Sequence, residues 1–168
     1  MNRYTVAVLV KNQFGVLNRV TSMFRRRQFN ISALTVSETE SSEFSRITVV
    51  FDGEEHNKDQ LVNQLYKLPD VCSIKELDEK NSVSCELMLI KMQNDSDSRE
   101  DIRAAADAFE AKTMNYSKDS IVLMLTGDSN RLDEFINLMR EYTILEICRT
   151  GSVSLEKGAT TIRKVTNF

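Results

Sequence analysis

Histidine, cysteine, glycine and proline are all scarce in this sequence, and each scarcity excludes a class of chemistry. The chain has one histidine, His56, so a Ser–His or Cys–His catalytic relay has no choice of base. Its five glycines are too scattered for a Walker A loop or a G-x-G-x-x-G dinucleotide fingerprint. We therefore expect no catalytic residues and no cofactor in this chain.

The three cysteines, Cys72, Cys85 and Cys148, lie far apart in the sequence. Their odd number and their spacing fit neither a disulfide framework nor a zinc site, which indicates a reducing compartment. The net charge of −3 gives no general attraction to nucleic acid or membrane. No apolar run approaches the length of a membrane span, about 20 residues, and the first residues enter a strand without the pattern of a signal peptide. These features predict a cytoplasmic globular protein without a metal site.

The most informative stretch is Lys-Asn-Gln-Phe-Gly-Val-Leu at 11–17, which joins an alternating strand to an amphipathic helix. Gly15 stands at the bend and is the only glycine of the first fifty residues. A helix start presents unpaired, partly positive N–H groups, and glycine lets another molecule approach them closely. The stretch therefore suits a small anion such as a carboxylate or a phosphate. A plain turn in which glycine only relieves strain explains the same residues, and the pattern alone leaves both interpretations open.

Hydrophobic periodicity predicts the same order of elements twice. In the first half we expect strands at 4–10, 30–36, 45–51 and 71–77, with helices at 15–27 and 57–68. Pro69, the only proline, ends the second helix. In the second half we expect strands at 83–92, 112–116, 121–126 and from 143, one helix opened by 95–98, and one helix capped at 127–129.

Each half thus has the order βαββαβ, which is typical of a ferredoxin-like antiparallel sheet with both helices on one face. The fold class predicted is α+β, with two tandem ferredoxin-like units. A charged break at 78–81 places the expected domains at 1–78 and 79–168. The repeat is one of element order rather than of residue identity. No structure is predicted for the basic, polar tail after Gly151.

An ordered set of motifs resembles a known family. The run Val-Leu-Val-Lys-Asn-Gln-Phe-Gly-Val-Leu-Asn-Arg-Val at 8–20 is similar to the start of an ACT domain. The motifs at 24–31, 34–36, 45–48, 64–68 and 86–91 narrow the resemblance to the small, regulatory subunit of acetolactate synthase (acetohydroxyacid synthase), over nearly the whole chain. The family often has glycine where this chain has Gln28, and serine where it has Ala33. The first departure removes a preferred helix C-cap.

In that family the large catalytic subunit carries thiamine diphosphate, FAD and magnesium. It condenses pyruvate with pyruvate or 2-oxobutanoate on the route to valine, leucine and isoleucine. The resemblance implies that this chain is not an enzyme on its own. It implies a partner of the large subunit that raises the activity of that subunit and mediates feedback inhibition by valine. It also implies a homodimer through ACT domains, with the amino acid at the interface.

The resemblance further implies an effector site, which we place at Asn12, Gly15, Val16, Leu17, Asn30 and Ile31. The amides of residues 15–17 would hold the carboxylate of valine, and the side-chain oxygens of Asn12 and of a neighbouring subunit's Asn30 would accept from its ammonium. Val16, Leu17 and Ile31 would surround its side chain.

Two other functions stay open. A free-standing ACT-type amino-acid sensor or transcriptional regulator would need a basic DNA-binding element, which the acidic chain does not offer. An enzyme in its own right would need the catalytic constellation that the composition disfavours.

Overall fold

The structure of this chain is a computed structural model, which describes residues 2–165. They form two compact units: one holds the residues up to 83 together with those from 153 onward, and the other holds residues 84–152. The expected domains, 1–78 and 79–168, differ from these units in the boundary and in the final segment. The break at 78–81 is a turn in which the amide of Asn81 donates to the carbonyl oxygen of Asp78 over 3.1 Å.

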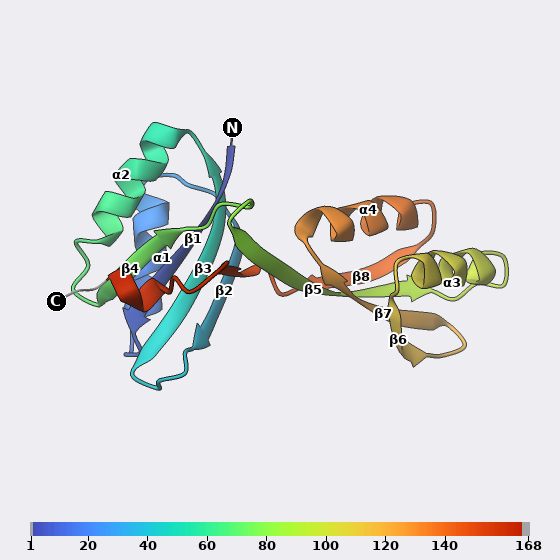
Figure 1. The fold of residues 1–168 in the computed structure, drawn as a ribbon. Coiled ribbons are helices and arrows are strands. Elements are labelled where there is room, and N and C mark those ends of the chain that lie inside the picture. The colour runs from blue at the N-terminus through green and yellow to red at the C-terminus, as the bar shows by residue number, and fades with distance from the viewer. Residues whose placement is uncertain (1, 166–168) are drawn as a thin grey trace. The chain divides into compact units, whose positions relative to one another are not determined.

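The first unit is a four-stranded antiparallel sheet with two helices on one face (Figure 1). Its elements are β1 (Asn2–Lys11), α1 (Val16–Arg26), β2 (Ile31–Glu38), β3 (Phe44–Gly53), α2 (Glu55–Leu65) and β4 (Val71–Glu76). The strand order β2-β3-β1-β4 makes β2 an edge strand. The expected order of elements is confirmed, although α2 ends three residues earlier than the helix that was predicted to run to residue 68.

Alternation along the central strands builds the core of the first unit. Alternate residues of β1 from Val6 to Val10, and of β3 from Ile47 to Phe51, face the helices and are buried, as an amphipathic strand requires. The fully enclosed residues are Val6, Val8, Val10, Val16, Val20, Phe24, Ile47, Val49, Phe51, Leu61, Leu65 and Ile74.

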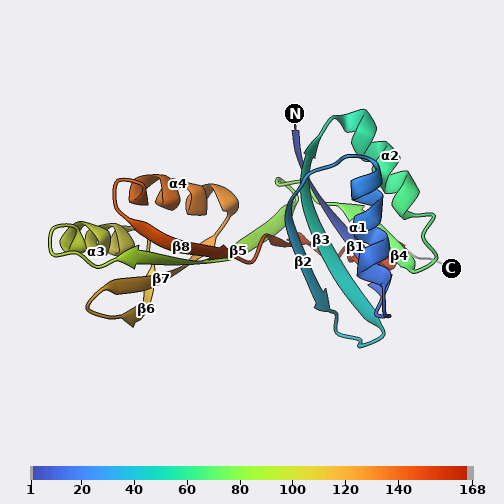
Figure 2. The ribbon, with the colours of Figure 1, turned by 180° about the vertical axis from the view of Figure 1, so that it is seen from behind.

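The opposite face of this sheet is also covered. Ala7 and Leu9 alternate with the core residues of β1, yet they are 0% and 3% exposed. Residues 153–165, red in Figure 1, cross this face, and Figure 2 shows α1 on the other side of the sheet. The segment holds strand β9 (Val153–Glu156) and a short 3₁₀ helix, η1 (Ile162–Val165), which packs against β1 and β4. The tail therefore belongs to the fold of the first unit.

The second unit repeats the arrangement. Its elements are β5 (Ser82–Gln93), α3 (Arg99–Ala108), β6 (Lys112–Tyr116), β7 (Ser120–Gly127), α4 (Ser129–Met139) and β8 (Ile144–Arg149). The strand order β6-β7-β5-β8 matches that of the first unit, so β6 takes the place of β2. Both helices cover one face (Figure 2). Among the described residues, no helix is long and apolar enough to cross a membrane.

A charged network holds the end of the second sheet together. Glu86 is 5% exposed and accepts two hydrogen bonds from Arg149, at 2.7 and 2.9 Å, and one from Ser129 at 3.0 Å. Burial raises the pKa of the Glu86 carboxyl, but the hydrogen bonds from Arg149 and Ser129 outweigh burial and leave that pKa below its ordinary value. The ionised carboxylate thus ties β5, β8 and α4 to one another.

The first helix of each unit ends in a Schellman motif without glycine. Gln28 has φ +58°, its amide donates to the Arg25 carbonyl, and the Phe29 amide donates to the Phe24 carbonyl. In the second unit Glu110 has φ +53°, with the same two bonds from residues 110 and 111 to residues 107 and 106. The exit of α1 therefore keeps the usual Schellman geometry although Gln28 replaces the preferred glycine.

Candidate functional site

The turn between β1 and α1 leaves a helix N-terminus uncapped. Gly15 occupies the N-cap position with φ +80° and ψ −5°, so its left-handed conformation explains the glycine. No side chain caps the helix, and no acidic residue lies in its first turn. The positive end of the helix dipole is therefore not neutralised by the turn itself.

Hydrogen bonds decide which amides of this turn are free. The amide of Val16 donates to the carbonyl of Gln13 over 3.3 Å, which closes the turn. Among residues 2–165, the amides of Gly15 and Leu17 have no acceptor in the structure. The amides of Gly15 and Leu17 are thus available to an anion. The amide of Val16, which was also expected to bind the carboxylate, already donates within the turn.

Asn12 fixes the turn to the hairpin between β2 and β3. Its Nδ2 donates to Glu38 Oε1 over 2.9 Å and to the carbonyl of Ser42 over 3.0 Å, and its amide donates to the carbonyl of Glu43 over 2.8 Å. The Oδ1 of Asn12 has no donor within the described part of the chain. The turn therefore carries a free acceptor oxygen as well as the two free amides.

The six expected site residues do not meet within one chain. The side chain of Val16 is 3% exposed and lies in the core rather than in a pocket. Leu17 is 41% exposed beside the turn. Asn30 and Ile31 follow the far end of α1, an 11-residue helix, which separates them from Gly15 by about 16 Å along the helix axis. A site that contains all six must take Asn30 and Ile31 from a second copy.

The corresponding turn of the second unit is closed by its own side chains. Asn94 follows β5 as Asn12 follows β1, and its Nδ2 likewise donates to a hairpin carbonyl, that of Ser117, over 2.6 Å. Its Oδ1, however, accepts from Arg99 Nε over 2.8 Å. Glu100 and Asp101 occupy the first turn of α3 and compensate its dipole. Only the first unit leaves both the asparagine oxygen and the helix start open.

The sequence pattern did not identify two residues, Phe14 and Glu38, as part of this turn. Phe14 is fully exposed next to Gly15, which a turn pattern does not predict for an aromatic side chain. Glu38 orients the amide of Asn12, and nothing in the spacing of residues 12 and 38 signals their contact. The recurrence of asparagine directly after the first strand of each half was a signal in the sequence for the role of Asn12.

A charged pair lies on the other side of the turn. Arg19, one helical turn into α1, pairs with Asp70 through Nε at 2.8 Å and Nη2 at 2.7 Å. A Cβ atom placed on Gly15 would lie 3.4 Å from Arg19 Nη1. The guanidinium therefore borders the helix start, with its charge compensated by the Asp70 carboxylate.

Comparisons with known proteins cover both units. Residues 6–73 match the family model described as the AHAS small subunit-like ACT domain, and residues 85–158 match the model described as the small subunit of acetolactate synthase. The chain is 41% identical over 155 residues to the acetolactate synthase small subunit of Mycolicibacterium smegmatis, covering 92% of this chain and 91% of that protein. It is 38% identical over 154 residues to the acetolactate synthase small subunit of Bacillus subtilis, covering 91% and 90%.

A solved structure agrees with these matches. The crystal structure of the acetolactate synthase small subunit from Thermotoga maritima superposes with a TM-score of 0.86 at 33% identity. The likeness covers 95% of this chain and 100% of that one.

Proposed function

Because this chain belongs to the family of acetolactate synthase small subunits, we propose that it is a non-catalytic regulatory subunit. It binds the large catalytic subunit, which holds the thiamine diphosphate, FAD and magnesium, and raises its activity. Valine binds at the turn between β1 and α1 and withdraws that effect, as the feedback signal of branched-chain amino acid biosynthesis in the cytoplasm.

The observation that carries this proposal is the hydrogen bond from Asn12 to Glu38, which ties the turn to the end of the edge strand β2. If β2 pairs antiparallel with β2 of a second copy about a two-fold axis, the start of each strand lies beside the end of the other. Asn30 and Ile31 stand at that start. The pairing brings them to the turn of the other copy, beside Asn12, Gly15 and Leu17.

Exposed apolar side chains support the same edge as a dimer interface. Leu34 pairs with Val49 and Val36 with Ile47, so both face the side of the sheet that carries α1. They are 36% and 41% exposed. An unpaired edge strand with apolar side chains is costly to leave in water, and a second copy of the strand would cover it.

The polar groups suit a free amino acid. The amides of Gly15 and Leu17 receive the carboxylate at the positive end of α1. The Oδ1 of Asn12 and that of the partner subunit's Asn30 accept from the ammonium group. Leu17 and the partner subunit's Ile31 enclose the side chain. Valine regulates because it binds one arrangement of the paired ACT domains more tightly than another.

Substitution of Gly15 tests this function. We expect Gly15→Asp to keep the activation of the large subunit but to lose inhibition by valine, because the new carboxylate occupies the anion position. Gly158→Asp is the matched control, since Gly158 has φ +81° with nothing within 4 Å of an added Cβ, and it should retain inhibition. The measurement is acetolactate formation by the reconstituted complex across a valine titration. Full inhibition of the Gly15→Asp complex contradicts the site.

The same assay separates the alternatives. Turnover of pyruvate by this chain alone, with thiamine diphosphate, would favour an enzyme. A chain that binds valine but leaves the large subunit unchanged would favour a free-standing sensor.

A further inference from the structure

We propose that a cavity in the second unit, between α3 and the edge strand β6, binds a free α-amino acid with a large apolar or aromatic side chain. This cavity is independent of the turn at Gly15 and needs only one copy of the chain. It has a volume of about 360 Å³, within the range of small-molecule sites, about 300–1,000 Å³.

The cavity exists because the second unit lacks an aromatic plug that the first unit has. In the first unit Phe24, Phe29 and Phe51 pack between α1 and the edge of the sheet, with ring centroids 5.1 to 6.5 Å apart. Phe24 is the third-last residue of α1, Phe29 is the last residue of its Schellman motif, and Phe51 pairs with the first residue of β2.

The corresponding residues of the second unit are much smaller. Ala106 is the third-last residue of α3, and Ala111 ends its Schellman motif. Leu123 pairs with Thr113, which lies two residues after Ala111. In the same way, Phe51 pairs with the residue that lies two positions after Phe29. Two alanines and one leucine therefore stand where the first unit has three phenylalanine rings, and they leave the corresponding space unfilled. The floor that remains is apolar, made by Ile102, Ala106, Ile121 and Leu123.

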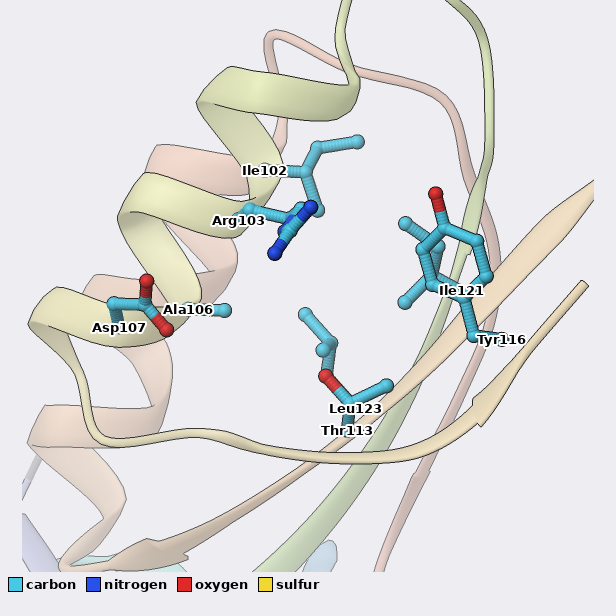
Figure 3. A pocket seen from close by; sticks show the side chains of 8 residues that line it. All are labelled: Ile102, Arg103, Ala106, Asp107, Thr113, Tyr116, Ile121 and Leu123. Atoms are coloured by element: carbon cyan, nitrogen blue, oxygen red, sulfur yellow. The ribbon is translucent and has the colours of Figure 1, made fainter.

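The rim of the cavity carries one positive and one negative side chain. Arg103 and Asp107 stand one helical turn apart on α3, so their side chains leave neighbouring positions, about 6 Å apart at Cβ. Figure 3 shows Arg103 projecting over the opening from α3, with the hydroxyl-bearing Tyr116 on the far side. Within residues 2–165, neither charged side chain has an ion pair or hydrogen bond.

Asp107 is placed against the rule for helix ends. It lies in the last turn of α3, where the helix dipole is negative and which contains no basic residue. A carboxylate there costs stability unless a cation binds it, and local conflicts of this kind mark functional positions. An ammonium group would find both Asp107 and the negative helix end.

One ligand class fits the apolar cavity, the positive charge of Arg103 and the negative charge of Asp107 together. The carboxylate of an α-amino acid pairs with Arg103, its ammonium group pairs with Asp107, and its side chain fills the space that rings fill in the first unit. The hydroxyls of Thr113 and Tyr116 are within the lining and offer further hydrogen bonds. A phenyl ring is the side chain that the repeat itself places at this position.

The test uses the full chain with methyl-labelled isoleucine and leucine. Titration with L-phenylalanine should shift the methyl signals of Ile102, Ile121 and Leu123 in the millimolar range through ring currents. The same titration of Gly15→Asp should give the same shifts, so that failure of the proposed valine site leaves this result unchanged. Absence of these shifts overturns the proposal.

Variants and analogues check the polar contacts. We expect Arg103→Gln to weaken binding about tenfold by removing the charge-assisted bond. Thr113→Phe should abolish binding by placing a ring in the cavity. Arg140→Gln removes an exposed charge elsewhere on this unit and should not matter. The ligands 3-phenylpropanoate and 2-phenylethylamine each lack one charged group and should bind at least tenfold more weakly. Equal binding by Arg103→Gln, or by either analogue, contradicts the zwitterion site.

Discussion

The left-handed residue Gln28 shows how a single side chain sets the stability of a helix exit. A non-glycine residue in this conformation lowers the stability of the fold by about 1–2 kcal/mol, a strain that glycine would avoid. Glycine would keep only part of this advantage, because it also raises the conformational entropy of the unfolded chain. We expect Gln28→Gly to raise the free energy of unfolding by about 0.5–1 kcal/mol. Urea unfolding measures it. Arg26→Gly, inside the same helix, should instead lower stability by about 1 kcal/mol, and equal effects of both changes would contradict this account.

Glu86 makes the stability of the second unit depend on pH. Its pKa in the folded chain lies below the ordinary value of 4.5, because the bonds from Arg149 and Ser129 outweigh burial. The stability from the ionised carboxylate is therefore complete above the unfolded pKa and is lost as pH falls through the folded pKa.

We expect Glu86→Gln to lower the free energy of unfolding at pH 7 by about 1–3 kcal/mol, since a buried charged bond is lost. The difference from the unchanged protein should shrink below pH 4. Glu146→Gln removes an exposed partner of Lys91 and serves as the control with little effect. Urea unfolding at several pH values measures both, and a difference that grows toward acid would contradict the assignment.

Single residues were the least predictable level. The glycine at the bend followed from the strand-to-helix pattern, since that junction requires φ near +80°. The engaged amide of Val16 and the burial of its side chain did not follow, because both depend on how the turn closes in three dimensions. The contact between Asn12 and Glu38 spans 26 residues, and no local pattern encodes it.

At the scale of elements, the hairpin between β2 and β3 connects the turn to the tail. Asn12 binds its Glu38 end, while Arg163 of η1 pairs with Glu40 at 2.9 Å and lies over the ring of Phe44 at 5.3 Å. Arg46 of β3 donates to the carbonyl of Ser154 over 2.7 Å. The tail is thus a structural element of the first unit.

Removal of the tail should therefore destabilise the first unit more than the second, which loses only the pairing of β9 with β5. A chain that ends at residue 152 exposes Ala7 and Leu9, and we expect the first unit to lose about 2 kcal/mol or more of unfolding free energy. Hydrogen exchange resolved by residue measures this, with the core of the second unit, such as Ile90 and Phe135, as the internal control. Unchanged protection of β1, or equal loss in both units, would contradict the role of the tail.

Elements with strong periodicity were predicted, and those without it were not. The twelve helices and strands of the two repeats followed from alternation and helical spacing, which burial against a core imposes. β9 and η1 have only four residues each, too few for a period to be recognised in the sequence. They pack on the face of a sheet whose strands are more than 60 residues away in sequence. A local sequence pattern cannot predict a contact at that separation.

At the scale of the whole molecule, the tandem repeat explains both proposed sites as differences between similar units. The first unit fills its aromatic space and leaves its turn open, while the second closes its turn and leaves the aromatic space empty. The order βαββαβ was predicted for both. The division of the chain was not, because the final segment returns to the first unit after the second is complete.

The central claim is that each valine site takes its turn from one copy and Asn30 from the other, and complementation between two defective variants tests it most directly. Gly15→Asp and Asn30→Leu should each lose valine binding in calorimetry. Co-expressed together, half of their dimers would be mixed, and each mixed dimer would hold one intact site. The account predicts recovery of about a quarter of the normal number of sites. No recovery on mixing, or full binding by Asn30→Leu alone, would contradict it.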